Sequence, residues 1–283
     1  MIIFKGNERF AYRDPACCFE DGICHLFFTV SEKDDGYMYN RIAHSQSSDL
    51  KNWTIPEFIT PKDTELNFSS PGNIIRHNGE FLICICSYPL TKPFAEEWIA
   101  HDTARLYLIR TKDFKSYSEP ELINPKGNTL PDDLGRMIDP YILEKNDGYY
   151  LFFKQNGVSL SRSQDLKNWE FLGSTDGGEN VCVLEHNGEY LLIHSPENGI
   201  AIAKSNDLEN WSDYLYTTLL QDEWDWAAGR LTAAFAAKLP EGSAYKYIMF
   251  FHGSKDVFPE THGDATLAAA FTDDFESFVY ELN

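Results

Sequence analysis

Positive charge is scarce in this chain, and long apolar runs are missing. Its 24 Lys and Arg stand against 44 Asp and Glu, for a formal net charge of −20. Such an acidic surface repels phosphate backbones and anionic lipid, so it disfavours nucleic acid and membrane surfaces as partners. No stretch is long and apolar enough to span a bilayer, and the opening MIIFKGNERFAYRDP does not read as a secretory leader. We therefore expect a cytoplasmic protein with a neutral ligand.

Motifs of several enzyme classes are also missing. The sequence has no CxxC pair or zinc-type His spacing, no glycine-rich nucleotide loop and no Gly-x-Ser-x-Gly elbow. Its six cysteines lie at 17, 18, 24, 84, 86 and 182, and several alternate with apolar residues as buried free thiols would. We expect a reduced protein that requires no cofactor.

Aromatic residues and an internal repeat are abundant. Phe, Tyr and Trp make up 14% of the chain, which favours strands and offers flat apolar faces to sugars. One phrase recurs as IAHSQSSDLKNW at 42–53, LYLIRTKDFKSY at 106–117, VSLSRSQDLKNW at 158–169, IAIAKSNDLENW at 200–211 and LAAAFTDDFESF at 267–278. Each copy reads as a strand, then a turn whose aspartate bonds nearby amides, then a closing aromatic.

A second phrase precedes the first. Four copies pair two β-rich runs across Asp-Gly or Asn-Gly, a strong hairpin signal, and the fifth has a longer turn. A hairpin and two further strands make a four-stranded antiparallel blade, and five blades close around a central channel. We predict an all-β, five-bladed β-propeller, with a β-sandwich as the alternative. It would form one domain over 1–283, with blades beginning near 14, 69, 138, 178 and 229.

Three of the five blade openings carry a carboxylate. Asp14 precedes its hairpin glycine by 8 residues, and Asp139 and Glu179 precede theirs by 9. First strands of propeller blades line the channel, so these acids should face one another across one pocket. Grouped carboxylates repel, which raises at least one pKa, and glycoside hydrolysis needs such a set. The alternative for each residue taken singly is an ordinary turn or exposed loop.

These features resemble glycoside hydrolase family 43, which shares a five-bladed propeller with relatives such as the family 32 fructosidases. The resemblance rests on Asp14-Pro15, Asp139-Pro140 and Glu179, each followed by a hairpin with an aromatic second strand. It implies that Asp14 is the general base, that Asp139 tunes a pKa and orients, and that Glu179 is the general acid.

The chain also departs from the families it resembles. Family 43 members often follow the acid with Gly-Pro, whereas Glu179 is followed by Asn180-Val181. The triplet Arg13-Asp14-Pro15 is similar to the Arg-Asp-Pro of family 32, but the Asn-Asp-Pro-Asn of that family is absent and no room remains for its appended sandwich. We therefore favour the inverting mechanism of family 43.

Further residues are candidates for substrate or metal binding. The substrate-binding candidates are blade-opening or inserted cations, a serine and indoles: Arg13, Ser70, Arg136, Arg230, Trp98, Trp224 and Trp226. For the tryptophans, core packing is the alternative to stacking on sugar rings. Some family 43 enzymes hold a calcium ion in the channel with a histidine, so the resemblance makes His252 a candidate ligand; the alternative is a hydrogen-bonded core histidine.

The sequence thus predicts a glycosidase that removes terminal arabinofuranosyl or xylosyl units from oligosaccharides. Enzyme alternatives on the same fold are a retaining β-fructosidase and a mannoside phosphorylase. A phosphorylase needs basic residues for phosphate, and this acidic chain offers few obvious ones beyond Arg13, Arg136 and Arg230. The alternative from another class is a propeller that only binds carbohydrate. Sugar, linkage, anomer and oligomeric state are left open.

Overall fold

Tight turns built by aspartates recur through the molecule. A computed structural model describes residues 1–283 except 64, 90–102, 218, 220–222, 257–263 and 282–283. Asp49 Oδ1 accepts hydrogen bonds from the amides of Lys51 and Asn52, at 2.9 and 2.7 Å. The same pattern is found at Asp113, Asp165, Asp207 and Asp274. The predicted acidic turn is confirmed in all five repeats, and it sets where each third strand ends.

Two-residue turns join the inner strands. Asp21-Gly22, Asn78-Gly79 and Asn187-Gly188 all have positive φ at both positions, between 51° and 84°. This is the turn whose twist matches that of paired antiparallel strands, and Asn, Asp and Gly tolerate its left-handed backbone. These predicted hairpins are therefore present, and they fix the pairing register of the inner strands in blades 1, 2 and 4.

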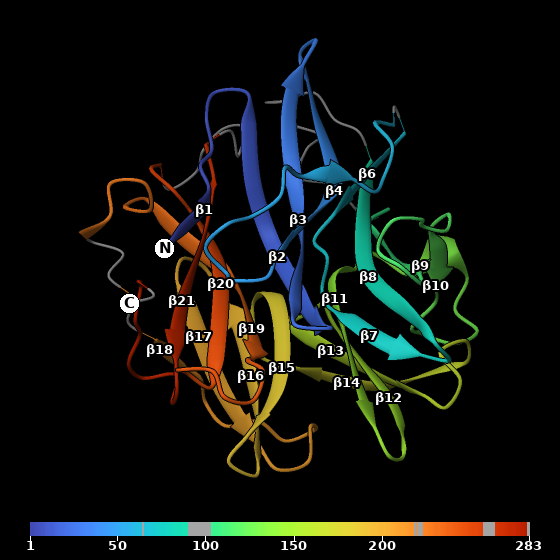
Figure 1. The fold of residues 1–283 in the computed structure, drawn as a ribbon. Helices are drawn as coiled ribbons and strands as arrows, with labels where there is room; N and C mark the ends of the chain where they lie inside the picture. The colour runs from blue at the N-terminus through green and yellow to red at the C-terminus, as the bar shows by residue number, and fades with distance from the viewer. Residues whose placement is uncertain (64, 90–102, 218, 220–222, 257–263, 282–283) are drawn as a thin grey trace.

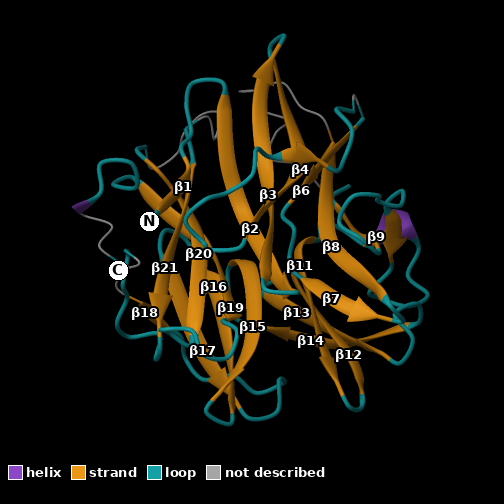
Figure 2. Ribbon diagram, viewed as in Figure 1, coloured by secondary structure: helices purple, strands orange, loops and turns teal. Residues whose placement is uncertain are grey.

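Each blade is an antiparallel sheet, and almost no helix is present in the described residues (Figure 2). The strands of blade 1 are β2 (Phe10–Glu20), β3 (Ile23–Asp34), β4 (Tyr37–Ser47) and β5 (Glu57–Phe58). Those of blade 2 are β6 (Leu66–Ser69) with β7 (Ile74–His77), β8 (Glu80–Pro89), β9 (Arg105–Thr111) and β10 (Glu121–Ile123). In blade 2 the innermost strand is interrupted, because β6 and β7 both pair with β8.

The remaining blades follow in chain order. Blade 3 comprises β11 (Ile138–Lys145), β12 (Gly148–Lys154), β13 (Val158–Ser163) and β14 (Trp169–Thr175). Blade 4 comprises β15 (Glu179–His186), β16 (Glu189–Ser195), β17 (Ile200–Ser205) and β18 (Leu215–Thr217). Blade 5 comprises β19 (Arg230–Lys238), β20 (Tyr247–Ser254), β21 (Thr266–Thr272) and β1 (Ile2–Phe4).

The first strand of the chain closes the ring. In Figure 1 the blue strand β1 lies beside the red strand β21, where Ile2 pairs with Ala268. The last blade therefore takes its outermost strand from the N-terminus, which joins the two ends of the chain without a covalent link. The predicted five-bladed propeller is confirmed, and this closure is a feature that the repeat did not reveal.

Buried aromatic and aliphatic side chains fill the space between blades. The largest core cluster includes Phe28 of blade 1, Phe152 of blade 3 and Phe250 of blade 5. The cysteines are free thiols, and all but Cys18 are buried, as the sequence predicted. Among the described residues, no helix has the length and apolarity needed to cross a membrane.

Blade 1 is longer than the others and rises beside the channel mouth. Strands β2, β3 and β4 have 11, 12 and 11 residues, against 6 to 8 in the strands of blade 3. Glu32 stabilises this extension, because its carboxylate accepts hydrogen bonds from Arg9 and Arg41 at 2.8 and 2.7 Å. Within the described residues, one side of the channel mouth therefore has a wall that blade 3 lacks.

Gly72 makes the tightest junction between blades 2 and 3. A Cβ atom added to it would lie 1.2 Å from the carbonyl oxygen of Pro140, so the Gly72→Ala substitution forces one backbone to move. We expect it to lower the free energy of unfolding by about 3 kcal/mol, measured by urea denaturation. As a control, Gly79→Asn lies in open space at a φ of 79° that Asn tolerates, and should cost about 0.5 kcal/mol or less. Equal losses in the two variants would contradict the close packing at Gly72.

Candidate active site

Five residues with left-handed backbone, one from each blade, surround the channel axis. Their φ angles are close to one another: Asp14 49°, Ser70 48°, Asp139 53°, Asn180 56° and Ala233 58°. All five line one small pocket. In four blades the residue lies where the pairing of the inner two strands shifts, as in a β-bulge. A bulge turns a side chain out of the alternating pattern, and here it directs these side chains toward the axis.

The amides of these residues bond to side chains of the preceding blade. The Ser70 amide donates to Thr29 Oγ1 at 2.8 Å. The Ala233 amide donates to Ser195 Oγ at 2.9 Å, and the Asp14 amide to His252 Nδ1 at 3.1 Å. Strained left-handed backbone persists only where surrounding contacts hold it. Each such bond therefore both joins two blades and fixes a residue of the pocket.

Blade 3 lacks the side-chain acceptor that the other blades offer to the following blade. Its residue at the accepting position is Lys154, which pairs with Ile138 as Ser195 pairs with Glu179. An ammonium group cannot accept a hydrogen bond, and Lys154 donates to Gly177 O instead. The Asn180 amide turns to Asp139 Oδ2 at 2.9 Å. A carboxyl group of the pocket thus replaces the missing acceptor.

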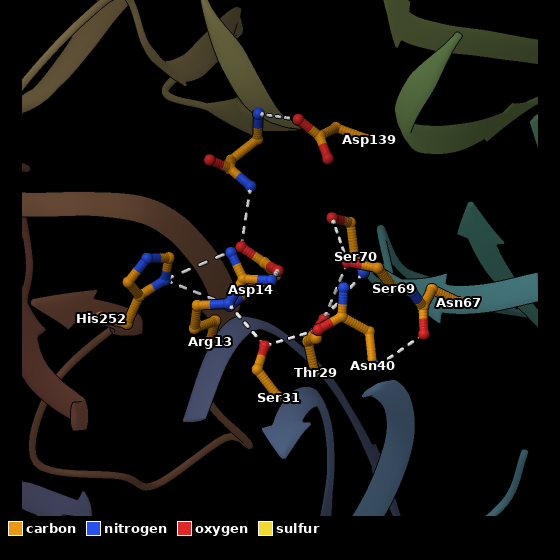
Figure 3. Close-up of polar contacts among 11 residues, drawn as sticks. Arg13, Asp14, Thr29, Ser31, Asn40, Asn67, Ser69, Ser70, Asp139 and His252 are labelled. Carbon is orange, nitrogen blue, oxygen red and sulfur yellow. Dashed lines mark hydrogen bonds and ion pairs between the residues drawn. The ribbon is translucent and has the colours of Figure 1, made fainter. Parts of the chain in front are cut away.

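Asp14 is buried and held ionised. Asp14 is 7% exposed. Figure 3 shows its carboxyl group turned toward Ser70 and Asp139, with Arg13 and His252 beside it. Burial opposes the charge, but the Arg13 guanidinium, 3.9 Å from Oδ2, and the Thr29 hydroxyl outweigh it and lower the pKa of Asp14. A carboxylate that stays charged in a buried pocket is suited to accept a proton.

Asp139 has the opposite environment. It is 4% exposed, and burial, followed by the nearby charges of Glu179 and Asp14, raises its pKa to about 7. The sequence predicted that grouping the carboxylates would raise at least one pKa, and Asp139 shows this effect, because it holds its proton near neutral pH. Asp14 and Asp139 lie in one pocket but favour different protonation states.

Glu179 lies one residue before the ring position, which corrects the predicted register. The count of 9 residues to Gly188 suggested equivalence with Asp139, but Asn180 occupies the equivalent place. The cause lies in the hairpins, because Gly188 is the second residue of the turn between His186 and Glu189, whereas Gly148 follows its turn and pairs with Lys145. The count to the glycine is therefore one residue longer in blade 3. The Glu179 side chain remains near Asp139, is 40% exposed, and accepts a hydrogen bond from Arg136 Nη2 at 3.3 Å. It is the solvent-facing acid of the three.

His252 acts as a structural acceptor in this arrangement. Burial lowers its pKa to about 3, so the ring is neutral and its Nδ1 accepts from the Asp14 amide. Among the described residues, no group of three or more His, Cys, Asp or Glu side chains could hold a metal. The described side chains thus form no calcium cage of protein ligands, and the calcium ion in the channel stays a prediction.

The substrate-binding candidates occupy different places. Ser70 lines the pocket. Arg13 is anchored through Nε to Ser31 Oγ at 3.2 Å and remains beside Asp14, and Arg230 lies close enough to lower the pKa of Asp14 further. Arg136 is paired with Glu179. These four surround the acids, so polar groups that could bind sugar hydroxyls do converge there.

The two tryptophan candidates that the structure describes lie away from the acids. Trp224 and Trp226 stack on each other with ring centroids 5.2 Å apart, and both lie nearly parallel to Phe251 against the core. Trp98 lies outside the described residues. The residue that sequence reasoning missed is Asn180. A signal for it was present, because Asn180 precedes Gly188 by the same 8 residues that separate Asp14 from Gly22.

The raised pKa of Asp139 has a consequence for stability. Because its folded pKa of about 7 exceeds the ordinary 3.8, folding takes up a proton between these values. Stability from this group is therefore present at about pH 4 and is lost as the pH rises through about 7. We expect Asp139→Asn, which cannot ionise, to become more stable relative to wild type between about pH 5 and pH 8, as measured by urea unfolding at both. A stability difference independent of pH would contradict the assignment.

Comparison with known proteins places the fold. No family model and no curated protein matches this chain. It is similar to a GH43_1 enzyme from Xanthomonas citri solved with xylotriose: TM-score 0.66, 12% identity, over 98% of this chain and 93% of that one. An exo-1,5-α-L-arabinanase from a bovine ruminal metagenomic library matches at TM-score 0.66 and 14% identity, over 100% and 99%. The GH43 β-1,3-galactosidase BT3683 matches at 0.66 and 13%, over 99% and 100%. The chain therefore has the five-bladed propeller fold of family 43 glycoside hydrolases, as its motifs predicted.

Proposed function

We propose that the protein is a glycoside hydrolase with Asp14, Asp139 and Glu179 as its catalytic carboxyls. The observation that carries this proposal is the unlike environment of the two buried acids, since Asp14 has a lowered pKa and Asp139 a pKa raised to about 7. Glycosidases need one carboxyl that is charged and one that carries a proton. The family 43 enzymes of the same fold support the class of reaction.

The proposed reaction uses each carboxyl differently. Asp14 takes a proton from a water molecule as its oxygen attacks the anomeric carbon, and the pocket has a cavity of about 20 Å³, enough for one water. Glu179 donates a proton to the glycosidic oxygen, which leaves as an alcohol. Asp139, whose pKa is raised to about 7 by burial and by the charges of Glu179 and Asp14, lies beside Glu179 and orients it.

The substrate proposed is an oligosaccharide with a terminal arabinofuranosyl or xylosyl unit. Solved neighbours include a complex with xylotriose and an arabinanase, and Arg13, Ser70, Arg136 and Arg230 supply donors for hydroxyl groups around the acids. The long blade 1 closes one side of the mouth, which suits removal of end units. A cytoplasmic location stays a prediction from composition.

Substitution of each acid should separate their roles. We expect Asp14→Asn to lower kcat about 10²–10⁴-fold on every glycoside, because the general base is needed whatever the leaving group. Glu179→Gln should lose as much on natural oligosaccharides and much less on nitrophenyl glycosides, whose leaving group needs no proton. The assay is turnover on a panel of α-L-arabinofuranoside, β-D-xyloside, β-D-galactoside and β-fructoside substrates.

Matched controls lie on the same strands and hairpins. Asp21→Asn, at the turn of the hairpin that contains Asp14, and Glu185→Gln, on the strand of Glu179, should retain wild-type turnover. Full activity of Glu179→Gln on oligosaccharides would show that the acid is misassigned. If the wild type binds sugars in calorimetry but releases none, the binding-only propeller is the better description.

The configuration of the product tests the inverting mechanism. We expect proton NMR of the first released sugar to show the anomer opposite to that of the substrate, because water attacks directly. A product with retained configuration would instead support a covalent intermediate, as in the fructosidase alternative. The same reaction with inorganic phosphate added should proceed at an unchanged rate; phosphate-dependent release of a sugar phosphate would favour the phosphorylase alternative.

A further inference from the structure

Asn180 contacts both buried carboxyl groups of the pocket. Its backbone amide donates to Asp139 Oδ2 at 2.9 Å, and its side-chain Nδ2 donates to Asp14 Oδ1 at 3.3 Å. These two acids belong to blades 1 and 3, and Asn180 belongs to blade 4. A single residue therefore links two carboxyls that are 125 positions apart in sequence.

The residue type suits this place in two ways. Its φ of 56° is left-handed, a conformation that Asn adopts more readily than most residues. Its amide group can only donate through nitrogen, so the Asp14 oxygen that faces it must accept. An aspartate of the same shape would put another carboxylate beside Asp14 and Asp139, where like charges repel.

We propose that Asn180 is a positioning residue that fixes Asp14 as the proton acceptor and holds it in place relative to Asp139. This inference rests on the proposed hydrolysis. It assigns a function to Asn180, which follows the general acid Glu179 in sequence and does not itself touch the reacting atoms. The side-chain hydrogen bond to Oδ1 restrains rotation of the Asp14 carboxylate. The backbone bond to Asp139 ties the second carboxyl to the same residue.

Several other groups act on Asp14, and the test must take them into account. These groups are Arg13 on its own strand, Arg230 on β19, His252 on β20, Asp139 on β11 and the buried thiol of Cys86 on β8. Arg13 and Arg230 favour the charged form of Asp14, and the charge of Asp14 in turn raises the pKa of Asp139. None of these groups changes when the Asn180 side chain is replaced. A shift in the pKa of Asp14 can therefore be attributed to the replaced side chain of Asn180.

The test compares Asn180→Gly with Asn180→Asp. Glycine keeps the left-handed backbone and its amide but removes the donor to Asp14, whereas aspartate keeps the shape and adds a carboxyl group. Carboxyl ¹³C NMR titration, assigned with Asp14→Asn and Asp139→Asn, should show Asp14 titrating at higher pH in both variants, further in Asn180→Asp. In turnover assays the acid limb of the kcat/KM profile should move the same way. We expect kcat to fall about tenfold with KM little changed.

A matched control separates backbone from side-chain effects. Asn187 has a φ of 52° in the hairpin turn of the same blade, so Asn187→Gly makes the same change far from the acids. It should leave the titration of Asp14 and the pH profile as in wild type. If Asp14 titrates identically in wild type and both Asn180 variants, the inference is overturned, whatever the activity. If Asp14 shifts but the wild type turns over no glycoside, the proposed hydrolysis fails instead.

Discussion

The structure depends on a repeated hydrogen bond between blades. In each blade a residue near the axis has left-handed backbone, and in four of the five its amide donates a hydrogen bond to a side chain of the preceding blade. In blade 3 the amide of Asp139 faces the buried thiol of Cys86, and it opposes the rise in pKa that burial gives that thiol. Because a buried amide without a partner costs free energy, each blade requires its neighbour. The same bonds that close the ring therefore place the five side chains of the pocket.

The chemistry of the pocket follows from how this ring is filled. Burial acts on Asp14 and Asp139 alike, and what separates them is the surrounding charge. Asp14 has Arg13 beside it, whereas Asp139 faces two other acids. Lys154 contributes from a distance, because its failure to accept a hydrogen bond leaves the Asn180 amide for Asp139. A change at a supporting position can thus alter the hydrogen bonding of the two buried carboxyl groups.

The fold tolerates great divergence in sequence, because few positions carry strict local requirements. Structures at 12–14% identity share the propeller over nearly the whole chain. What this chain needs locally is modest: an acidic turn after each third strand, a left-handed pair in the hairpins, and one glycine, Gly72, where blades approach closely. Apolar side chains of many kinds can fill the space between blades. The ring position is more demanding, since each residue there must accept left-handed backbone and give its amide a partner.

The sequence by itself determined the repeat, the hairpins, the turn aspartates and hence the five blades, because each is a local pattern with a local physical cause. It also singled out Asp14 and Asp139, since Asp-Pro stands at the same place in two blades. Only the tertiary structure decided that β1 completes blade 5, that Asn180 rather than Glu179 occupies the ring position, and that Trp224 and Trp226 pack on Phe251. Contacts between distant strands depend on partners that no local pattern names, so they could not be predicted from the sequence. The spacing of 8 residues from Asn180 to Gly188 matches that of Asp14, but Asp139 has a spacing of 9, and only the strand pairing decides between the two counts.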